Sequence, residues 1–99
     1  MDNKDPKGQI QIELPEDIAQ GTYSNLAIIA HSSSEFVVDF VRIVPGVQKA
    51  KVQSRIILTP EHAKRLLLAL NDNINRYESL NGTINLEHIA QNFTAAGEA

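Results

Sequence analysis

The segment at residues 35–44, EFVVDFVRIV, constrains the fold most because it is apolar on both sides. Most of its residues are β-branched or aromatic, which is typical of a strand. A strand with one solvated face alternates apolar and polar residues, because successive side chains point to opposite sides. Here the apolar residues are Phe36, Val38 and Phe40 on one side, and Val37, Val41 and Ile43 on the other. We therefore expect both faces of the sheet to be covered.

Three further segments have strand patterns. Residues 9–14, QIQIEL, alternate apolar and polar positions, which predicts a short strand with one buried face. Residues 22–31 are rich in β-formers, and residues 49–58 again alternate. The serines at 32–34 and the PGVQ sequence at 45–48 are predicted turns. Because short loops favour neighbouring strands, we predict a four-stranded antiparallel meander.

The pattern changes from strand to helix at Thr59-Pro60. Threonine is a preferred N-cap, and proline is favoured at the first helical position. Apolar residues then recur at intervals of three or four, which predicts an amphipathic helix. They are Ala63, Leu66, Leu67, Leu70, Ile74 and Tyr77. The helix should end near Asn81, with Gly82 just beyond it.

These elements predict one α+β domain of ββββα order in a chain of 99 residues. We expect a disordered tail at 1–8, the domain at 9–84, and a short helix followed by a disordered tail at 85–99. The chain has no cysteine, no apolar run long enough to span a membrane, and a polar start unlike a secretory signal. A cytoplasmic location is therefore expected.

A meander with PGVQ as a loop would place Val37, Val41, Ile56 and Leu58 on one face. We expect the helix to cover that face, since its own apolar stripe needs a cover. The other face would then expose a patch for a homo-oligomer, most simply a dimer. Its predicted interface residues are Ile29, Phe36, Val38 and Ile57. The alternative is that the C-terminal segment around Phe93 folds back over this face.

The same face is expected to carry an aromatic and basic cluster. Its residues are Tyr23, Asn25, Phe40, Arg42, Lys51 and Arg55. Such a surface suits a protein partner, or a single strand of nucleic acid whose bases stack on rings and whose phosphates meet cations. The alternative is that Tyr23 stacks on Arg42 as a cation–π pair within the oligomer interface. The net charge of −3 argues against strong non-specific binding to nucleic acid.

No constellation of residues indicates catalysis. Glu35 and Asp39 would share a strand face, but we expect Asp39 to accept structural hydrogen bonds, from Ser54 or the backbone. The three histidines lack the short spacings of metal sites. No phosphate-binding glycine loop or nucleophile elbow is present. We therefore predict no enzyme activity, no catalytic residue, no cofactor and no metal.

Four motifs resemble an uncharacterised prokaryotic family, domain-of-unknown-function family 3467. They are GTYSN at 21–25, EFVVDF at 35–40, SRIILTPEHAKRLL at 54–67 and YESLNGTI at 77–84. The resemblance covers roughly residues 9–84 and implies a small cytosolic protein of unknown activity. The predicted architecture also resembles the repeat plan of the PUR and Whirly single-stranded nucleic-acid binders, without a shared sequence motif.

Two functional hypotheses follow. The first is a non-enzymatic interaction module that forms a homo-oligomer through its second sheet face and receives an unknown protein partner. The second is a single-stranded nucleic-acid-binding protein of PUR-like or Whirly-like architecture. Neither hypothesis involves a membrane.

Overall fold

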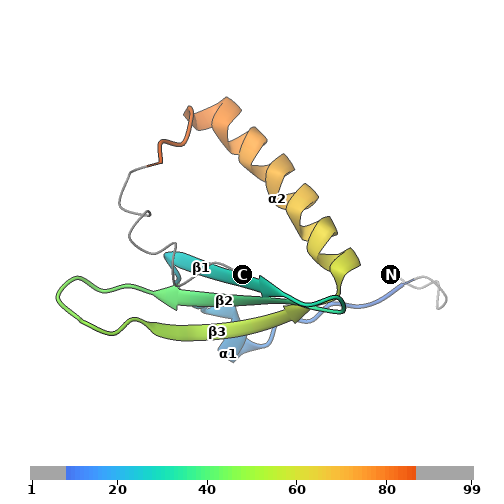
Figure 1. Ribbon diagram of the computed structural model, residues 1–99. Coiled ribbons are helices and arrows are strands. Elements are labelled where there is room, and N and C mark those ends of the chain that lie inside the picture. The colour runs from blue at the N-terminus through green and yellow to red at the C-terminus, as the bar shows by residue number, and fades with distance from the viewer. Residues whose placement is uncertain (1–8, 87–99) are drawn as a thin grey trace.

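A computed structural model describes residues 9–86 and shows a three-stranded antiparallel sheet with one long helix. The elements are α1 (Glu16–Ala19), β1 (Leu26–His31), β2 (Phe36–Arg42), β3 (Lys51–Leu58) and α2 (Pro60–Asn81). The strand order is β1-β2-β3, as in a meander. Figure 1 shows α2 rising from one side of the sheet and α1 on the opposite side. The α+β class and the long helix after the last strand are confirmed.

The prediction of a fourth strand at residues 9–14 was wrong for the single chain. These residues form no strand, and Ile10 and Ile12 are 86% and 92% exposed. Alternation shows that a segment has two chemically different sides, but it does not specify an edge for the backbone to pair with. The first strand of the sheet is β1, which begins at Leu26 rather than at residue 22.

The turn between β1 and β2 is centred one residue further along the chain than expected, which shifts the pairing by two residues. The Ser32 N–H donates to the Glu35 carbonyl at 2.9 Å, and the Ser32 hydroxyl accepts from the Ser34 and Glu35 N–H groups. A turn centred on Ser32 and Ser33, as the sequence predicts, would place Ile28 opposite Val37, but Ile28 lies opposite Asp39. A shift of two residues keeps each side chain of β1 on the same face relative to the side chains of β2.

A bulge between β2 and β3 has a larger effect. Val41 lies opposite Val52 as expected, but the register changes between Phe40 and Val41, so that Val38 lies opposite Ile56. A bulge adds one residue to one strand, which moves every later side chain of that strand to the other face. The second half of β3 is therefore inverted relative to the prediction.

Because of the bulge, α2 lies over the face of β1 and β2 opposite to the one expected, although Ile56 and Leu58 of β3 lie under it as expected. We call the face toward α2 the helix face; its side chains include Ile29, Phe36, Val38, Ile56 and Leu58. We call the other side the far face; its side chains include Val37, Asp39, Val41, Arg55 and Ile57. The chain enters α2 directly after Leu58, whose side chain points to the helix face, and α2 follows on that side.

Both ends of α2 are capped as predicted. The Thr59 hydroxyl accepts a hydrogen bond from the His62 N–H at 3.2 Å, and Pro60 occupies the first helical position. At the other end, Gly82 has φ of 91°, a conformation that favours glycine, and its N–H donates to the Glu78 carbonyl. Within the described residues, neither helix is long and apolar enough to cross a membrane.

The core of the single chain is very small. Among residues 9–86 only two apolar side chains are buried, Val38 at 7% exposure and Val41 at 3%. The tails predicted at 1–8 and near the C-terminus, and the helical segment containing Ile89 and Phe93, lie outside the described residues.

Candidate interaction surface

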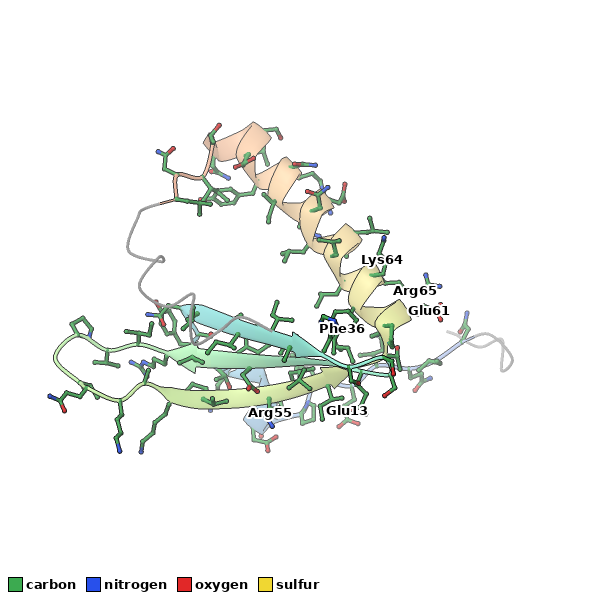
Figure 2. All side chains as sticks on the ribbon, in the orientation of Figure 1. Glu13, Phe36, Arg55, Glu61, Lys64 and Arg65 are labelled. Carbon is green, nitrogen blue, oxygen red and sulfur yellow. The ribbon has the colours of Figure 1, made fainter. Side chains whose placement is uncertain are left out.

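An apolar cleft lies between the first turns of α2 and the helix face. We call it the open cleft; its volume is about 480 Å³. Its lining comes from all three strands and α2: Ile29, Phe36, Val38, Leu58, Pro60, Ala63, Lys64, Leu66, Leu67 and Leu70. Figure 2 shows Phe36 on the side of the sheet toward α2. The cleft is wide because α2 diverges from the sheet beyond its first turns (Figure 1).

The apolar stripe of α2 is left in solvent along most of its length. Its residues are Ala63, Leu67, Leu70, Ile74 and Tyr77, spaced by four, three, four and three positions. This is the spacing with which helices pack against other helices. No residue of α2 is buried. A helix held only by its own chain would normally bury such a stripe, because most helical stability comes from packing.

The opposite side of α2 carries two exposed ion pairs. Arg65 pairs with Glu61 at 2.7 Å, and Arg76 pairs with Asp72 at 3.1 Å. Both pairs have i, i+4 spacing and lie about half a turn from the apolar stripe, as the period of 3.6 residues requires. The ion pairs mark the solvent side of the helix.

The structure separates the four predicted interface residues. Ile29, Phe36 and Val38 line the open cleft, beneath α2, instead of a helix-free face. Ile57 is exposed on the far face, because it follows the bulge. Sequence reasoning did not assign Leu66, Leu67 and Leu70 to an interface. The four-three spacing of the stripe indicates helix packing in the sequence, but it also fits packing against the chain's own sheet, which is what the sequence analysis predicts.

The aromatic and basic cluster is also divided. The Arg42 guanidinium lies 5.6 Å from the Tyr23 ring centroid, and Lys51 lies opposite Arg42. Asn25 instead extends the β1–β2 pairing, since its side chain bonds to both the N–H and the carbonyl of Ile43. Phe40 is half-buried on the helix face, and Arg55 lies on the far face.

Three residues of this cluster stay together and are joined by Lys49, and we call this group the hairpin corner. It consists of Tyr23, Arg42, Lys49 and Lys51. The last three residues line a shallow hollow of about 250 Å³ together with Val44, Val47 and Gln53. The Tyr23–Arg42 contact is the cation–π pair named in the sequence-based alternative, whose placement in an oligomer interface stays a prediction.

Arg55 is engaged in a two-pronged salt bridge on the far face. Its Nε and Nη2 atoms donate to the two Asp39 carboxylate oxygens at 2.7 and 2.8 Å. The residues lie directly opposite each other on β2 and β3. The expected Ser54 partner was wrong, because the bulge places Ser54 opposite Phe40 and brings Arg55 to Asp39. The hydrogen bonds from Arg55, aided by its positive charge and opposed by partial burial, hold the pKa of the Asp39 carboxyl below its ordinary value.

We expect Asp39→Asn to destabilise the protein at neutral pH and much less in acid. A carboxyl whose pKa is lowered by folding stabilises the native state above its ordinary pKa of 3.8, and this contribution is lost as the pH falls below that value. Urea midpoints of the two proteins should therefore differ at about pH 7, and the difference should shrink steadily as the pH is lowered below 3.8. Asp72→Asn, which removes one exposed helix pair, is the matched control and should change little. A pH-independent difference for Asp39→Asn would contradict the assignment.

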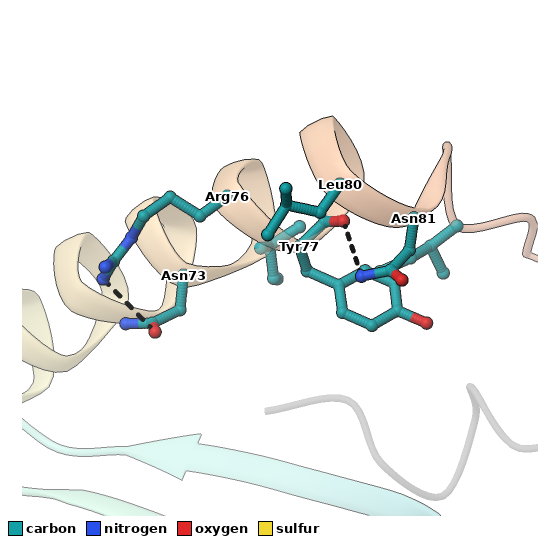
Figure 3. Close-up of a pocket in the computed structure, with 7 residues that line it drawn as sticks. Asn73, Arg76, Tyr77, Leu80 and Asn81 are labelled. Carbon is teal, nitrogen blue, oxygen red and sulfur yellow. Dashed lines mark hydrogen bonds between the residues drawn. The ribbon is translucent and has the colours of Figure 1, made fainter.

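A second hollow lies at the C-terminal end of α2 and has a volume of about 600 Å³. Figure 3 shows its polar side chains bonded to their own helix: Arg76 donates to Asn73, and Asn81 donates to the Tyr77 carbonyl. Leu80 and Ile84 complete the lining. Because these polar groups are satisfied locally, the hollow presents mainly the apolar continuation of the α2 stripe.

The described residues form no cluster of three or more histidine, aspartate or glutamate side chains that could hold a metal ion. His31 stacks on Phe36 with ring centroids 5.3 Å apart. Glu35 is exposed in the turn before β2, so that it does not form a carboxylate pair with Asp39 inside the strand.

Comparison with known proteins gives one match. The model of a family described as "Protein of unknown function (DUF3467)" matches residues 1–86. No curated protein and no solved structure matches.

Proposed function

Since the chain belongs to the DUF3467 family of proteins of unknown function, we propose a function from its surfaces. In this proposal the protein is a non-enzymatic interaction module that forms a homodimer through the open cleft and the apolar stripe of α2. In this dimer the α2 helices of the two copies pack against each other over the two helix faces. The interface thus differs from the one expected from the sequence, in which the helix and the interface lay on opposite faces.

The exposed stripe of α2 is the observation that supports this proposal. The helix has 22 residues and is about 33 Å long, yet none of its side chains is buried. The open cleft beside it is lined almost wholly by apolar groups. Exposed apolar surfaces of this extent usually mark interfaces. A second copy carries the same stripe, so one two-fold contact covers both helices.

The chemistry of α2 favours another helix as the covering element. Leu67, Leu70 and Ile74 have the spacing that lets side chains of two helices interlock. The ion pairs on the opposite side of α2 remain in solvent in such an arrangement. The far face also remains accessible, and this surface is where we place a further protein partner.

The mass of the protein in solution tests the proposal. Light scattering coupled to gel filtration at micromolar concentration should give twice the 10.9 kDa of one chain. A mass of one chain would contradict the proposal. Higher symmetric assemblies would retain the interface but contradict the dimer.

Binding of single-stranded nucleic acid is the alternative, and the hairpin corner is its supporting observation. Three cations and one aromatic ring gather there, as a nucleic-acid strand would require. Fluorescence anisotropy with short single-stranded DNA and RNA should then show affinity that falls steeply with salt. Arg42→Ala and Lys51→Ala should weaken binding, whereas Arg55→Ala, on the far face, is the matched control. Absence of binding at low salt would reject this alternative.

A further inference from the structure

The segment at residues 9–14 has the chemistry of a strand but no strand partner among residues 9–86 of its own chain. Ile10, Ile12 and Leu14 are exposed along one side, and Gln9, Gln11 and Glu13 occupy the other. Figure 2 shows Glu13 on the same side of the sheet as Arg55, away from α2. The segment thus does not cover the open cleft, which is the large apolar surface of this chain.

The sheet offers one edge that suits such a strand. β1 is six residues long, with the sequence LAIIAH, and it contains no lysine, arginine, acidic residue, proline or glycine. Exposed strand edges are normally protected by charges, proline or bulges. β3, at the other edge, has such protection: Lys51, Arg55 and the bulge near Gln53. The unprotected edge of β1 therefore favours addition of a strand.

The segment and the edge of β1 match in length and in chemistry. Both have six residues, and each has apolar residues at alternate positions that could share the helix face, Ile12 in the segment and Ile29 in β1. An added strand with Ile12 beside Ile29 would extend the floor of the open cleft under the exposed stripe of α2. Its glutamines and Glu13 would then point toward the far face, as successive strand residues alternate.

We propose that residues 9–14 of one copy form the fourth strand of the sheet of a second copy, beside β1. This inference rests on the proposed homodimer. In its own chain the segment leads directly through Pro15 into α1, which lies on the side of the sheet away from α2 (Figure 1). The residue before β1, Asn25, holds this end of β1 to the chain after β2 through its side-chain hydrogen bonds to Ile43. The four-stranded sheet that the sequence predicts is thereby completed between chains.

Engineered cysteines test the exchange directly, because the chain has no cysteine of its own. Ile12→Cys and Ile29→Cys are made in separate proteins, one of them isotopically heavy, and are mixed in urea, refolded together and mildly oxidised. Neighbouring strands bring directly opposite side chains within disulfide distance. We expect a disulfide between one light and one heavy chain, identified by mass spectrometry.

Gln11→Cys mixed with Ile29→Cys is the matched control, because residue 11 is on the other side of the segment. We expect at least about five-fold less linked product than with Ile12→Cys, given the strict geometry of disulfides. Equal yields would contradict the strand arrangement. So would a disulfide within one chain in the double variant carrying both Ile12→Cys and Ile29→Cys.

Light scattering of the reduced proteins separates this inference from the proposed function. A two-chain mass without the specific disulfide overturns the strand exchange and leaves the homodimer in place. A one-chain mass for the protein without substitutions overturns both.

Discussion

Leu67→Asp is expected to convert the dimer into monomers, whereas Leu68→Asp should leave it a dimer. The two leucines are neighbours in α2, and both are 58% exposed in the single chain. Leu67 belongs to the apolar stripe and lines the open cleft, while Leu68 points more than a quarter-turn away. A monomeric protein would therefore respond to the two substitutions almost equally, and only a second copy makes them different.

The size of the effect follows from burial in the interface. Covering a leucine completely stabilises by about 1.5–3 kcal/mol, and a two-fold interface contains two copies of Leu67. Because Leu67 is 58% exposed in the single chain, the interface contributes roughly that share for each copy, and the loss is about 2–3.5 kcal/mol per dimer, or roughly a 20- to 400-fold weaker association. A buried, unpaired carboxylate adds to this cost.

Analytical ultracentrifugation across a concentration series measures this difference. Far-ultraviolet circular dichroism of both variants should show whether α2 remains folded, since a helix without its cover loses support. If Leu68→Asp dissociated the protein as strongly as Leu67→Asp, the stripe would not be the interface. Ala69, on a third side of the helix, offers a further control as Ala69→Asp.

The second large effect is a dependence of stability on protein concentration. With only Val38 and Val41 buried among residues 9–86, the single chain has little core to hold it folded. We expect folding and association to occur together, as in obligate dimers. Each ten-fold increase in concentration should then stabilise the dimer by about 1.4 kcal/mol, and raise the urea midpoint by roughly 0.5–1 M.

Unfolding curves at three concentrations, each separated by a factor of ten, provide the measurement. Circular dichroism and the fluorescence of Tyr23 and Tyr77 should give coincident transitions if no folded monomer accumulates. A midpoint that does not move with concentration would show that the single chain is stable alone. That result would contradict an obligate dimer even if some association were seen.

The sequence predicted the elements of this protein more reliably than their arrangement. Thr59, Pro60 and Gly82 correctly bounded α2, because caps act through atoms a few residues apart. The turns at 32–34 and 45–48 correctly separated the three strands, with Gly46 at φ of 85° in the second turn. These features depend on local backbone chemistry and are readable without knowledge of distant neighbours.

The candidate site was predicted only in part. The apolar residues of β2 were predicted to lie on both sides of the sheet, where Val38 and Val41 are found, and the Tyr23–Arg42 contact was among the alternatives. The cluster nevertheless broke up, since Arg55 bonds to Asp39 on the far face. No local pattern around Gln53 distinguishes a bulged strand from a regular one, so the β2 partner of every β3 residue after it was predicted incorrectly.

By itself, the sequence determined the class of fold, the position of the helix and the presence of apolar surface in excess of what one sheet and one helix can bury. Only the tertiary structure decided which face α2 covers, because a single bulge inverts the second half of β3. It also decided that residues 9–14 stay outside the sheet of their own chain. Side-chain periodicity is a property of one segment, whereas register and pairing depend on the contacts between segments.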